Sequence, residues 1–310
     1  MKIAFIVDPL ASLKAYKDSS IFMMREAAKR GHTVYAFEAH DMFVAGNVVS
    51  AKATHITVSS ADEAWVKIES TDVLALKTFD AVLMRKDPPF DSAYLHATLL
   101  LSLAAAEGAN VVNNPQALRD YNEKLAILKF SEFIAPTLVT SSMADVQSFV
   151  DQHGDTILKK LDGMGGTSIF RVRSDDLNRN AIVEVQTDYG NATIMAQRYI
   201  PAIAQGDKRV LVIDGVPMSH ALARIPKAGE TRGNLAAGGR GVAMPLTARE
   251  RTIAEALAPT LKADGLTIVG LDIIGDYLTE VNVTSPTCMV EIFAQANVNI
   301  AAAVVDALPH

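Results

Sequence analysis

Cysteine is almost absent from this chain of 310 residues, in which Cys288 is the only one. One cysteine cannot form an internal disulfide, and no charged segment followed by an apolar stretch opens the chain, so a cytoplasmic location is expected. Long hydrophobic runs are also missing, because the longest, around residues 99–106, is shorter than the roughly 20 residues that cross a bilayer. Cys288 is expected to pack as a small hydrophobic side chain.

An excess of positive charge is missing as well, since 29 Lys and Arg residues stand against 35 Asp and Glu residues, a formal net charge of −6. Binders of nucleic acids or membrane surfaces usually need a positive field, so neither is expected as a partner. The signatures GxSxG, HExxH and CxxC do not occur, and the seven histidines lack metal-ligand spacing. What is present is a hydrophobic content of 49%, enough for a large core in two or three folded units.

The first part of the chain alternates between short apolar runs and helical patterns. The run KIAFIV is typical of a strand buried on both faces. Further strands are expected at 33–37, 81–84 and 110–113, a hairpin at 48–58, and helices at 19–31, at 92–107 and from 116 onward. This alternation predicts a parallel α/β sheet. The turn after the first strand, DPLASLKAY, has no glycine fingerprint, which excludes a dinucleotide-binding start.

From about residue 136 the pattern changes to short strands separated by glycine loops. Antiparallel pairing is expected there, with helices at 144–152 and about 248–263, which together indicate an α+β domain. The C-terminal part of the chain, which begins with LTIVGLDIIGDYLTEVNV, predicts a β-hairpin and then one apolar closing helix at 291–308.

Spacing predicts the register of that last hairpin. A three-residue turn at 275–277 places Ile274 opposite Leu278 and Asp272 opposite Glu280, because paired positions sum to a constant.

Asn282 shares the face of Glu280, since side chains alternate along a strand. Two acids directly opposite one another destabilise a sheet unless a positive group lies between them. Oxygen ligands of this kind suit Mg²⁺, which is completed by substrate phosphates. The alternative interpretation is a solvated polar face on an edge hairpin.

A glycine-rich turn follows a strand that ends in lysine, in KKLDGMGGTS at residues 159–168. Glycines at 163, 165 and 166 allow backbone N–H groups to converge on an anion such as phosphate, and Lys159 adds a charge. The segment is no Walker P-loop, because the GK[ST] ending and the helix are missing. A plain hairpin turn is the other interpretation.

Two further strands carry charges that could serve a ligand. In GDKRVLVIDG, Asp207 and Arg209 project from one face, as a binding pair or a surface ion pair. In VLMRKDPPF, an apolar strand delivers Arg85 at its carboxyl end, where open α/β sheets bind ligands, although the double proline could simply end the strand.

The stretch RIPKAGETRGNLAAGGRG, residues 224–241, carries Arg224, Lys227, Arg232 and Arg240 among glycines. It exceeds the about 12 to 15 residues of ordinary loops, and such segments are usually lids or disordered linkers. Arginine is a good bidentate partner for phosphate and carboxylate, so a cationic cover for an anionic substrate is favoured.

These motifs resemble one family. RKDPPFD, NNPQALRDYNEKL, ILKKLDGMGG, GDKRVLVIDG, LARIPKAGETRGNLAAGGRG and LTEVNVTSPT occur in the order found in bacterial glutathione synthetases, which are ATP-grasp ligases, over essentially the whole chain. The resemblance implies an N-terminal parallel-sheet pre-ATP-grasp domain that binds substrate, residues 1–121, and after it a two-subdomain ATP-grasp fold. Its lid subdomain would be 122–200, and its C-terminal catalytic subdomain 201–310, with a large mobile loop at 225–241.

The resemblance also implies a reaction. ATP would phosphorylate the cysteinyl carboxylate of γ-glutamylcysteine, and the amine of glycine would attack the acyl-phosphate to give glutathione, ADP and phosphate. Mg²⁺, or Mn²⁺ in its place, would assist, and a homo-oligomer, a tetramer, is implied. The alternatives are another ATP-grasp carboxylate-amine ligase with a different acceptor and a non-catalytic nucleotide-binding regulator.

The same resemblance implies residue roles. Nucleotide binding falls on Lys124, Lys159, Gly163, Met164, Gly165, Gly166, Gln197, Arg198, Tyr199, Ile200 and Asp207, the metal ligands on Asp272, Glu280 and Asn282. Peptide and acyl-phosphate binding falls on Arg85, Arg209, Arg224, Arg232 and Ser285, and the catalytic arginines are Arg209, Arg224, Arg232 and Arg240.

Three positions depart from the family pattern. Lys160 stands where proline is common, which leaves open whether Lys159 or Lys160 contacts phosphate. Arg198 replaces a small polar residue, and Val290 a basic one.

Overall fold

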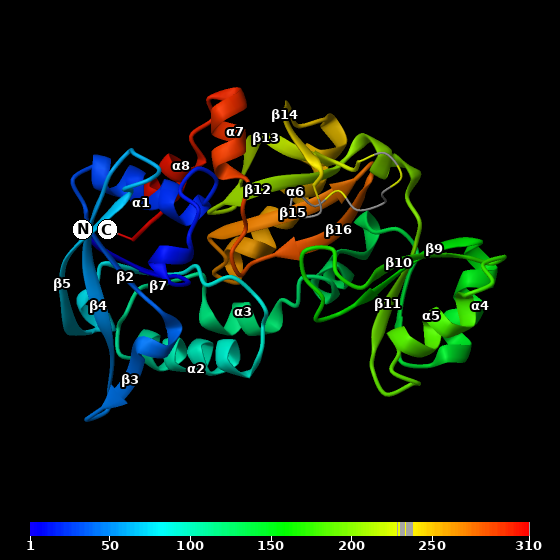
Figure 1. Cartoon of the computed structure of the whole chain (residues 1–310), viewed down its shortest axis with the longest axis horizontal. Coiled ribbons are helices and arrows are strands. Elements are labelled where there is room, and N and C mark those ends of the chain that lie inside the picture. The colour runs from blue at the N-terminus through cyan, green and yellow to red at the C-terminus, as the bar shows by residue number, and fades with distance from the viewer. Residues whose placement is uncertain (228, 230–232, 234–237, 310) are drawn as a thin grey trace.

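The computed structural model describes residues 1–309 except 228, 230–232 and 234–237. The described residues form three β-sheets of seven, four and five strands with helices packed on them. In Figure 1 the seven-stranded sheet lies at the left, the five-stranded sheet in the middle and the four-stranded sheet at the right. A cavity lies where elements of the three parts meet.

The N-terminal sheet has a parallel centre, as predicted. Strands β1 (Lys2–Ile6), β2 (Thr33–Phe37), β6 (Ala81–Met84) and β7 (Val111–Val112) pair parallel in the order β2-β1-β6-β7. Helices α1 (Ser19–Lys29), α2 (Ser92–Ala106) and α3 (Pro115–Asp120) accompany them. This arrangement brings the strand ends that precede Asp8, Glu38 and Arg85 to one edge of the sheet.

The hairpin predicted at 48–58 is wrong, because the structure has one continuous strand there. Strand β4 (Val48–Val58) pairs antiparallel with β3 (Met42–Ala45) and with β5 (Val66–Ala75). Its burial alternates over much of its length, as in a strand with one covered face. The turn lies before it, at Gly46 and Asn47, which both have positive φ, of 58° and 60°, as a two-residue hairpin turn requires.

The four-stranded sheet is antiparallel and carries its helices as a separate small core. Its strands are β8 (Thr137–Thr140), β9 (Asp155–Lys160), β10 (Ile169–Arg173) and β11 (Ile194–Arg198), in the order β10-β9-β11-β8. Helix α4 (Met143–His153) confirms the helix predicted at 144–152; the sequence analysis missed α5 (Arg179–Gln186). Val146, Leu158 and Ile194 belong to the apolar cluster that joins helix and sheet.

The five-stranded sheet is also antiparallel and is covered on both faces. It runs β14 (Arg240–Pro245), β13 (Val216–Ile225), β12 (Asp207–Ile213), β15 (Ile268–Ile274) and β16 (Tyr277–Asn282). Val210 and Val212 of β12 join the cluster of the predicted helix α6 (Ala248–Ala263), whereas Leu211 and Ile213 join that of the C-terminal helices, as alternation along a strand requires.

The single closing helix predicted at 291–308 is wrong, because two helices occupy this region. They are α7 (Met289–Ala296) and α8 (Ile300–Asp306). Asn297 ends α7 in the left-handed conformation with φ 57°, and the side chain of Asn299 accepts the cap hydrogen bond of α8 from Ala302 N at 3.0 Å. Both residues are among the few that favour such positions, so the break is encoded locally. No helix in the described ranges combines the length and the apolar character needed to cross a membrane.

One asparagine fastens the N-terminal sheet to the five-stranded sheet. The side chain of Asn113 is buried; its Nδ2 donates to Ile268 O at 2.8 Å and to Val283 O at 2.9 Å, and its Oδ1 accepts from Ile268 N at 2.8 Å. These bonds satisfy three backbone groups at the start of β15 and just after β16. The strand pair that carries the candidate metal ligands is thereby held against the N-terminal part.

We expect Asn113→Ala to lower the free energy of unfolding by about 3 kcal/mol, because it leaves three backbone groups without their partner. Urea denaturation followed by circular dichroism measures the change. Asn110→Ala is the matched control, since Asn110 is exposed and its side chain makes one hydrogen bond, to Asp80 O. An equal small effect of both substitutions would contradict this account of the junction.

Candidate active site

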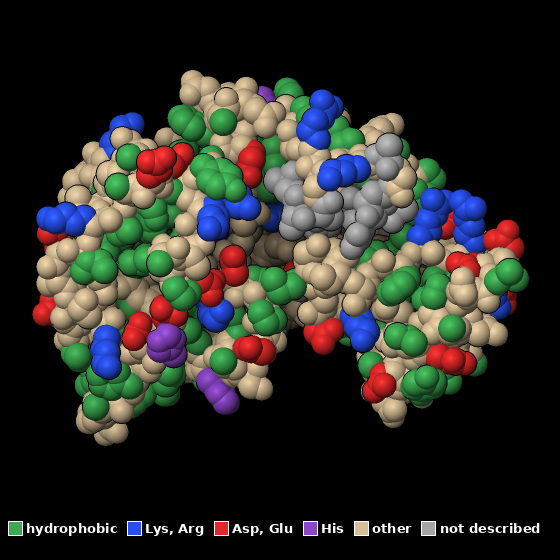
Figure 2. Space-filling model, viewed as in Figure 1, with side chains coloured by type: hydrophobic (Ala, Val, Ile, Leu, Met, Phe, Trp, Pro, Cys, Tyr) green, Lys and Arg blue, Asp and Glu red, His purple; other side chains and the backbone are tan. Residues whose placement is uncertain are grey.

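A cavity of about 380 Å³ lies between the four-stranded and five-stranded sheets, and the loop at 87–88 of the N-terminal part reaches it. Figure 2 shows the hollow in the middle of the molecule, with acidic and basic side chains around its mouth. The predicted site residues that line it are Lys124, Lys159, Gly163, Met164, Gly165, Gly166, Gln197, Arg198, Tyr199, Ile200, Asp207, Arg209, Arg224, Asp272, Glu280, Asn282 and Ser285. Residues that are far apart in the chain therefore line one cavity.

The hairpin of β15 and β16 has the predicted pairing of Asp272 with Glu280, but the predicted three-residue turn is wrong. Ile274 pairs with Tyr277, so the turn consists of Gly275, with φ 58°, and Asp276. Opposite the step from Asp272 to Ile273, the partner strand contains one extra residue, Thr279, which is a β-bulge. The bulge shifts the register by one residue and so restores the pairing of the two acids.

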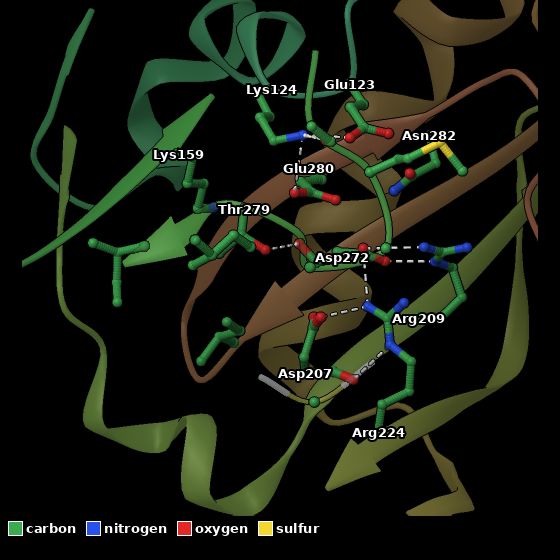
Figure 3. Close-up of a pocket in the computed structure, with 18 of the residues that line it drawn as sticks. Glu123, Lys124, Lys159, Asp207, Arg209, Arg224, Asp272, Thr279, Glu280 and Asn282 are labelled. Atoms are coloured by element: carbon green, nitrogen blue, oxygen red, sulfur yellow. Dashed lines mark hydrogen bonds and ion pairs between the residues drawn. The ribbon is translucent and has the colours of Figure 1, made fainter. Parts of the chain in front are cut away.

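Asp272 is held by two arginines, Arg209 of the adjacent strand β12 and Arg224 of the next strand, β13 (Figure 3). Arg209 donates to both carboxylate oxygens, and Arg224 Nη2 lies 2.9 Å from Oδ2. All three side chains are buried. Burial alone would raise the pKa of Asp272, but the charges of Arg209 and Arg224 outweigh it and hold this pKa well below its usual value. Asp272 is therefore ionised at neutral pH.

Asp207 is the second acid in this network. Its Oδ2 accepts a hydrogen bond from Arg224 Nη2, whereas its Oδ1 is buried without a partner among the described residues. Burial raises the pKa of Asp207 to about 7, and the nearby charge of Arg224 only partly opposes this. The free oxygen can accept a hydrogen bond from a ligand hydroxyl.

Lys159 is the lysine of β9 that faces the cavity. It is buried, its Nζ donates to Gln197 Oε1 at 3.3 Å, and burial lowers its pKa. Lys160, one position along the strand, does not line the cavity, because successive side chains point to opposite faces. The sequence leaves open whether Lys159 or Lys160 contacts phosphate. Because side chains alternate along β9, only Lys159 of the two faces the cavity.

Lys124 connects three parts of the site. Its ammonium is buried, pairs with Glu123 Oε1, donates to Gly163 O at 2.6 Å and lies 3.8 Å from Glu280 Oε1. Glu123, which was not predicted as a site residue, lines the cavity next to Lys124. Burial, and after it the charge of Glu280, raises the pKa of Glu123 to about 7. The sequence did contain a signal for Glu123, because it lies in the NEKL motif directly before Lys124, which the family resemblance identifies as a nucleotide-binding residue.

Two of the predicted arginines that the structure describes, Arg85 and Arg240, do not line the cavity. Arg85 is buried behind the wall, where its guanidinium donates to Ser20 Oγ at 3.1 Å and Pro286 O at 2.9 Å. Arg240 is exposed at the first position of β14. Arg232 lies outside the described residues, as does part of the predicted loop 225–241. Arg85 thus supports the segment that presents Ser285 to the cavity.

The acids on the hairpin offer oxygen ligands of the kind a hard cation takes. The Glu280 carboxylate lies 3.8 Å from its lysine partner, beyond hydrogen-bond distance, so its oxygens remain available. Asn282 lines the same cavity and pairs with Gly270, two positions along β15 from Asp272. Asp272 itself is turned to its arginines, and the described residues contain no preformed group of three or more His, Cys, Asp and Glu side chains for a metal. The donor set fits Mg²⁺ completed by ligand oxygens.

Two family models match the chain. The N-terminal domain of prokaryotic glutathione synthetase matches residues 1–119, and the ATP-grasp domain of prokaryotic glutathione synthetase matches residues 123–297. Among curated proteins, a glutathione synthetase from Ralstonia nicotianae is 54% identical over 308 residues, which cover 99% of this chain and 95% of that protein. One from Neisseria meningitidis serogroup B is 54% identical over 312 residues, with coverage of 99% and 98%.

Solved structures share the fold at low sequence identity. A D-cycloserine synthetase has a TM-score of 0.69 and 15% identity, with 100% of this chain and 99% of that chain covered. A RimK domain ATP-grasp protein from Sphaerobacter thermophilus has a TM-score of 0.66 and 17% identity, with full coverage of both chains. These likenesses confirm the predicted ATP-grasp architecture. Together with the family models and the full-length relatives, they show that the chain belongs to the prokaryotic glutathione synthetase family of ATP-dependent ligases.

Proposed function

We propose that the protein joins γ-glutamylcysteine and glycine at the expense of ATP, by way of an acyl-phosphate, to give glutathione, ADP and phosphate. The observation that carries the proposal is that lysines, arginines and the acids of the hairpin line the same cavity. Its residues lie within the family match to the ATP-grasp domain, apart from the loop at 87–88, which lies within the N-terminal match. Such a site works by positioning and charge neutralisation, without a covalent nucleophile.

The nucleotide would lie between the two antiparallel sheets. Residues 197–200, at the end of β11 and directly after it, would hold the adenine, and the free Oδ1 of Asp207 would accept a hydrogen bond from the ribose. The glycines at 163, 165 and 166 leave room for backbone N–H groups to approach phosphate. Lys124 and Lys159 would neutralise the phosphate charge.

Asp272, Glu280 and Asn282 would hold Mg²⁺, or Mn²⁺ in its place. When bound, the cation would neutralise charge on the phosphate oxygens during transfer. Glu280 is the ligand with the least committed carboxylate, whereas Asp272 would share its oxygens with Arg209 and Arg224. The hairpin register keeps all three in the cavity lining, with Glu280 3.8 Å from the ammonium of Lys124.

The peptide carboxylate and its acyl-phosphate would be held by cations. Arg209, Arg224 and Ser285 line the cavity and suit an anionic group. Arg232 and Arg240, on or beside the loop 225–241, would cover the site and keep water from the acyl-phosphate. Arg85 would act on the substrate through Pro286, whose backbone oxygen it binds.

Three further features rest on the family resemblance. The division into a substrate-binding domain (1–121), an ATP-grasp lid subdomain (122–200) and a catalytic subdomain (201–310) is proposed, and the cytoplasm is proposed as the compartment. A homotetramer is proposed as the assembly. Light scattering during gel filtration measures the mass of the assembly against the 33.2 kDa of one chain.

We expect ADP release, in a coupled assay with Mg²⁺, to require both γ-glutamylcysteine and glycine. Replacing glycine by glutamate or by a peptide acceptor should reduce the rate to background. ADP formation with one of those acceptors instead would assign the chain to a ligase with a different acceptor. Nucleotide binding without any ADP release would favour the regulator.

We expect Glu280→Gln to lower kcat by about 100-fold or more, because it removes a charged ligand of the proposed cation. Steady-state ADP release at saturating substrates measures the change. Asp276→Asn is the matched control, since Asp276 is an exposed acid at the turn of the same hairpin and does not line the cavity. Equal rates for Glu280→Gln and the wild type would refute the assigned role.

We expect Asp272→Asn to differ from Glu280→Gln in stability, although both would lose activity. Removing the charge of Asp272 leaves the buried Arg209 without its carboxylate partner and leaves Arg224 with Asp207 alone, which costs about 3–5 kcal/mol. Because the native pKa of Asp272 is lowered, its contribution is present above the ordinary pKa near 3.8 and is lost as pH falls below it. Urea midpoints at pH 7 test this difference, and similar midpoints for the two variants would contradict it.

A further inference from the structure

Lys124 has two carboxylates within reach and is bonded to only one of them. Its ammonium pairs with Glu123 Oε1 and lies 3.8 Å from Glu280 Oε1. Figure 3 draws both contacts as dashed lines. Burial alone would lower the pKa of Lys124, but the charges of Glu280 and Glu123 raise it. A charged ammonium that is 2% exposed must be compensated by a carboxylate. Which of the two acids pairs with Lys124 therefore determines which one remains available to another cation.

The backbone fixes Glu123 beside the hairpin. Val281 N donates to Glu123 O at 2.8 Å, between the two hairpin residues Glu280 and Asn282. Asn122 Oδ1 accepts from Lys124 N at 3.1 Å and from Leu125 N at 3.0 Å, which sets the start of the adjoining 3₁₀ helix, Leu125–Phe133. Glu123 is therefore held in register with Glu280 by main-chain contacts rather than by its own side chain.

The ammonium and a divalent cation would compete for Glu280. If Lys124 moved onto Glu280, it would occupy the oxygens that the hairpin offers to a metal and add a repelling positive charge there. Glu123 and Gly163 O together provide the ammonium with a different set of acceptors. The contact pattern thus leaves Glu280 as the less engaged of the two acids.

We propose that Glu123 is a positioning residue that keeps Lys124 away from Glu280 and so leaves Glu280 free to bind the divalent cation. The proposal rests on the proposed metal site, and through it on the proposed function. It assigns no contact with substrate or metal to Glu123 itself. Glu123 would affect metal binding only by positioning Lys124, so its effect should disappear when Lys124 is replaced.

The first test is binding of Mn²⁺, alone and with ADP, monitored by the loss of the free Mn²⁺ signal in electron paramagnetic resonance. We expect Glu123→Gln to weaken Mn²⁺ binding about tenfold, the scale of residues that act behind metal ligands. Glu132→Gln is the matched control, because Glu132 is an exposed acid on the adjoining 3₁₀ helix and should leave the affinity unchanged. Affinity unchanged in Glu123→Gln, or no Mn²⁺ retained by the wild type, would overturn the proposal.

The second test separates positioning from direct ligation. If Glu123 acts through Lys124, then Lys124→Met removes the competitor, and adding Glu123→Gln to that variant should cause no further loss of Mn²⁺ affinity. A further tenfold loss in the double variant would make Glu123 a ligand and refute the positioning role. Circular dichroism checks the fold of each variant; should Glu123→Gln not fold, Glu123→Asp, which draws the charge back by one methylene, is expected to give a smaller loss.

Metal retention and ligase turnover are measured separately, so the two proposals can fail separately. A wild-type protein that binds Mn²⁺ with the expected dependence on Glu123, but releases no ADP with γ-glutamylcysteine and glycine, would refute the function alone. A wild type that forms glutathione while Glu123→Gln keeps full Mn²⁺ affinity would refute the positioning role alone.

Discussion

The site depends on the pairing of buried charges across adjacent strands. Strand register places Arg209 opposite Asp272 and Asp207 opposite Arg224, so that each acid of the network faces an arginine on the neighbouring strand. A buried charge without a partner costs several kcal/mol, whereas a slip of one residue would turn every one of these side chains to the other face. The sheet register and the charge pairing therefore require one another. The positions of the charged side chains around the cavity therefore follow from the strand register.

The acids around the cavity are compensated unequally, and this inequality gives the site its chemistry. Asp272 is saturated by two guanidinium groups, but Glu280 meets its lysine only at 3.8 Å, and Glu123 and Asp207 both have pKa values raised to about 7. Burial is the main cause of both raised pKa values, and the nearby charges of Lys124 and Arg224 oppose it only in part. A cation from solution would add the positive charge that Glu280 lacks at hydrogen-bond distance. The arginines stay where an anionic substrate can use them.

How much the sequence could predict depended on the range of the interactions involved. Alternation of apolar runs gave the parallel sheet, and strand spacing gave the pairing of Asp272 with Glu280, although a shorter turn and a bulge at Thr279 produce it together. The continuous strand at Val48–Val58 was missed because its partners come from both sides in the chain. Arg85 was assigned to the cavity because it follows the carboxyl end of a strand, which gives the position of its backbone only. The position of its side chain depends on contacts with Ser20 and Pro286, which are distant in sequence.

The shared fold does not by itself choose the substrate. A solved structure with a TM-score of 0.69 and 15% identity is that of a D-cycloserine synthetase. Substrate specificity must therefore come from the residues that line the cavity rather than from the fold. In one cavity wall the backbone turns at Cys288, a buried residue that lines the cavity. Its φ is 84°, a left-handed conformation that costs a residue other than glycine about 1–3 kcal/mol. The turn is held from behind, since Arg85 binds Pro286 O and Ser19 Oγ accepts from Met289 N. The N-terminal part of the chain thus shapes a cavity wall formed by the ATP-grasp domain.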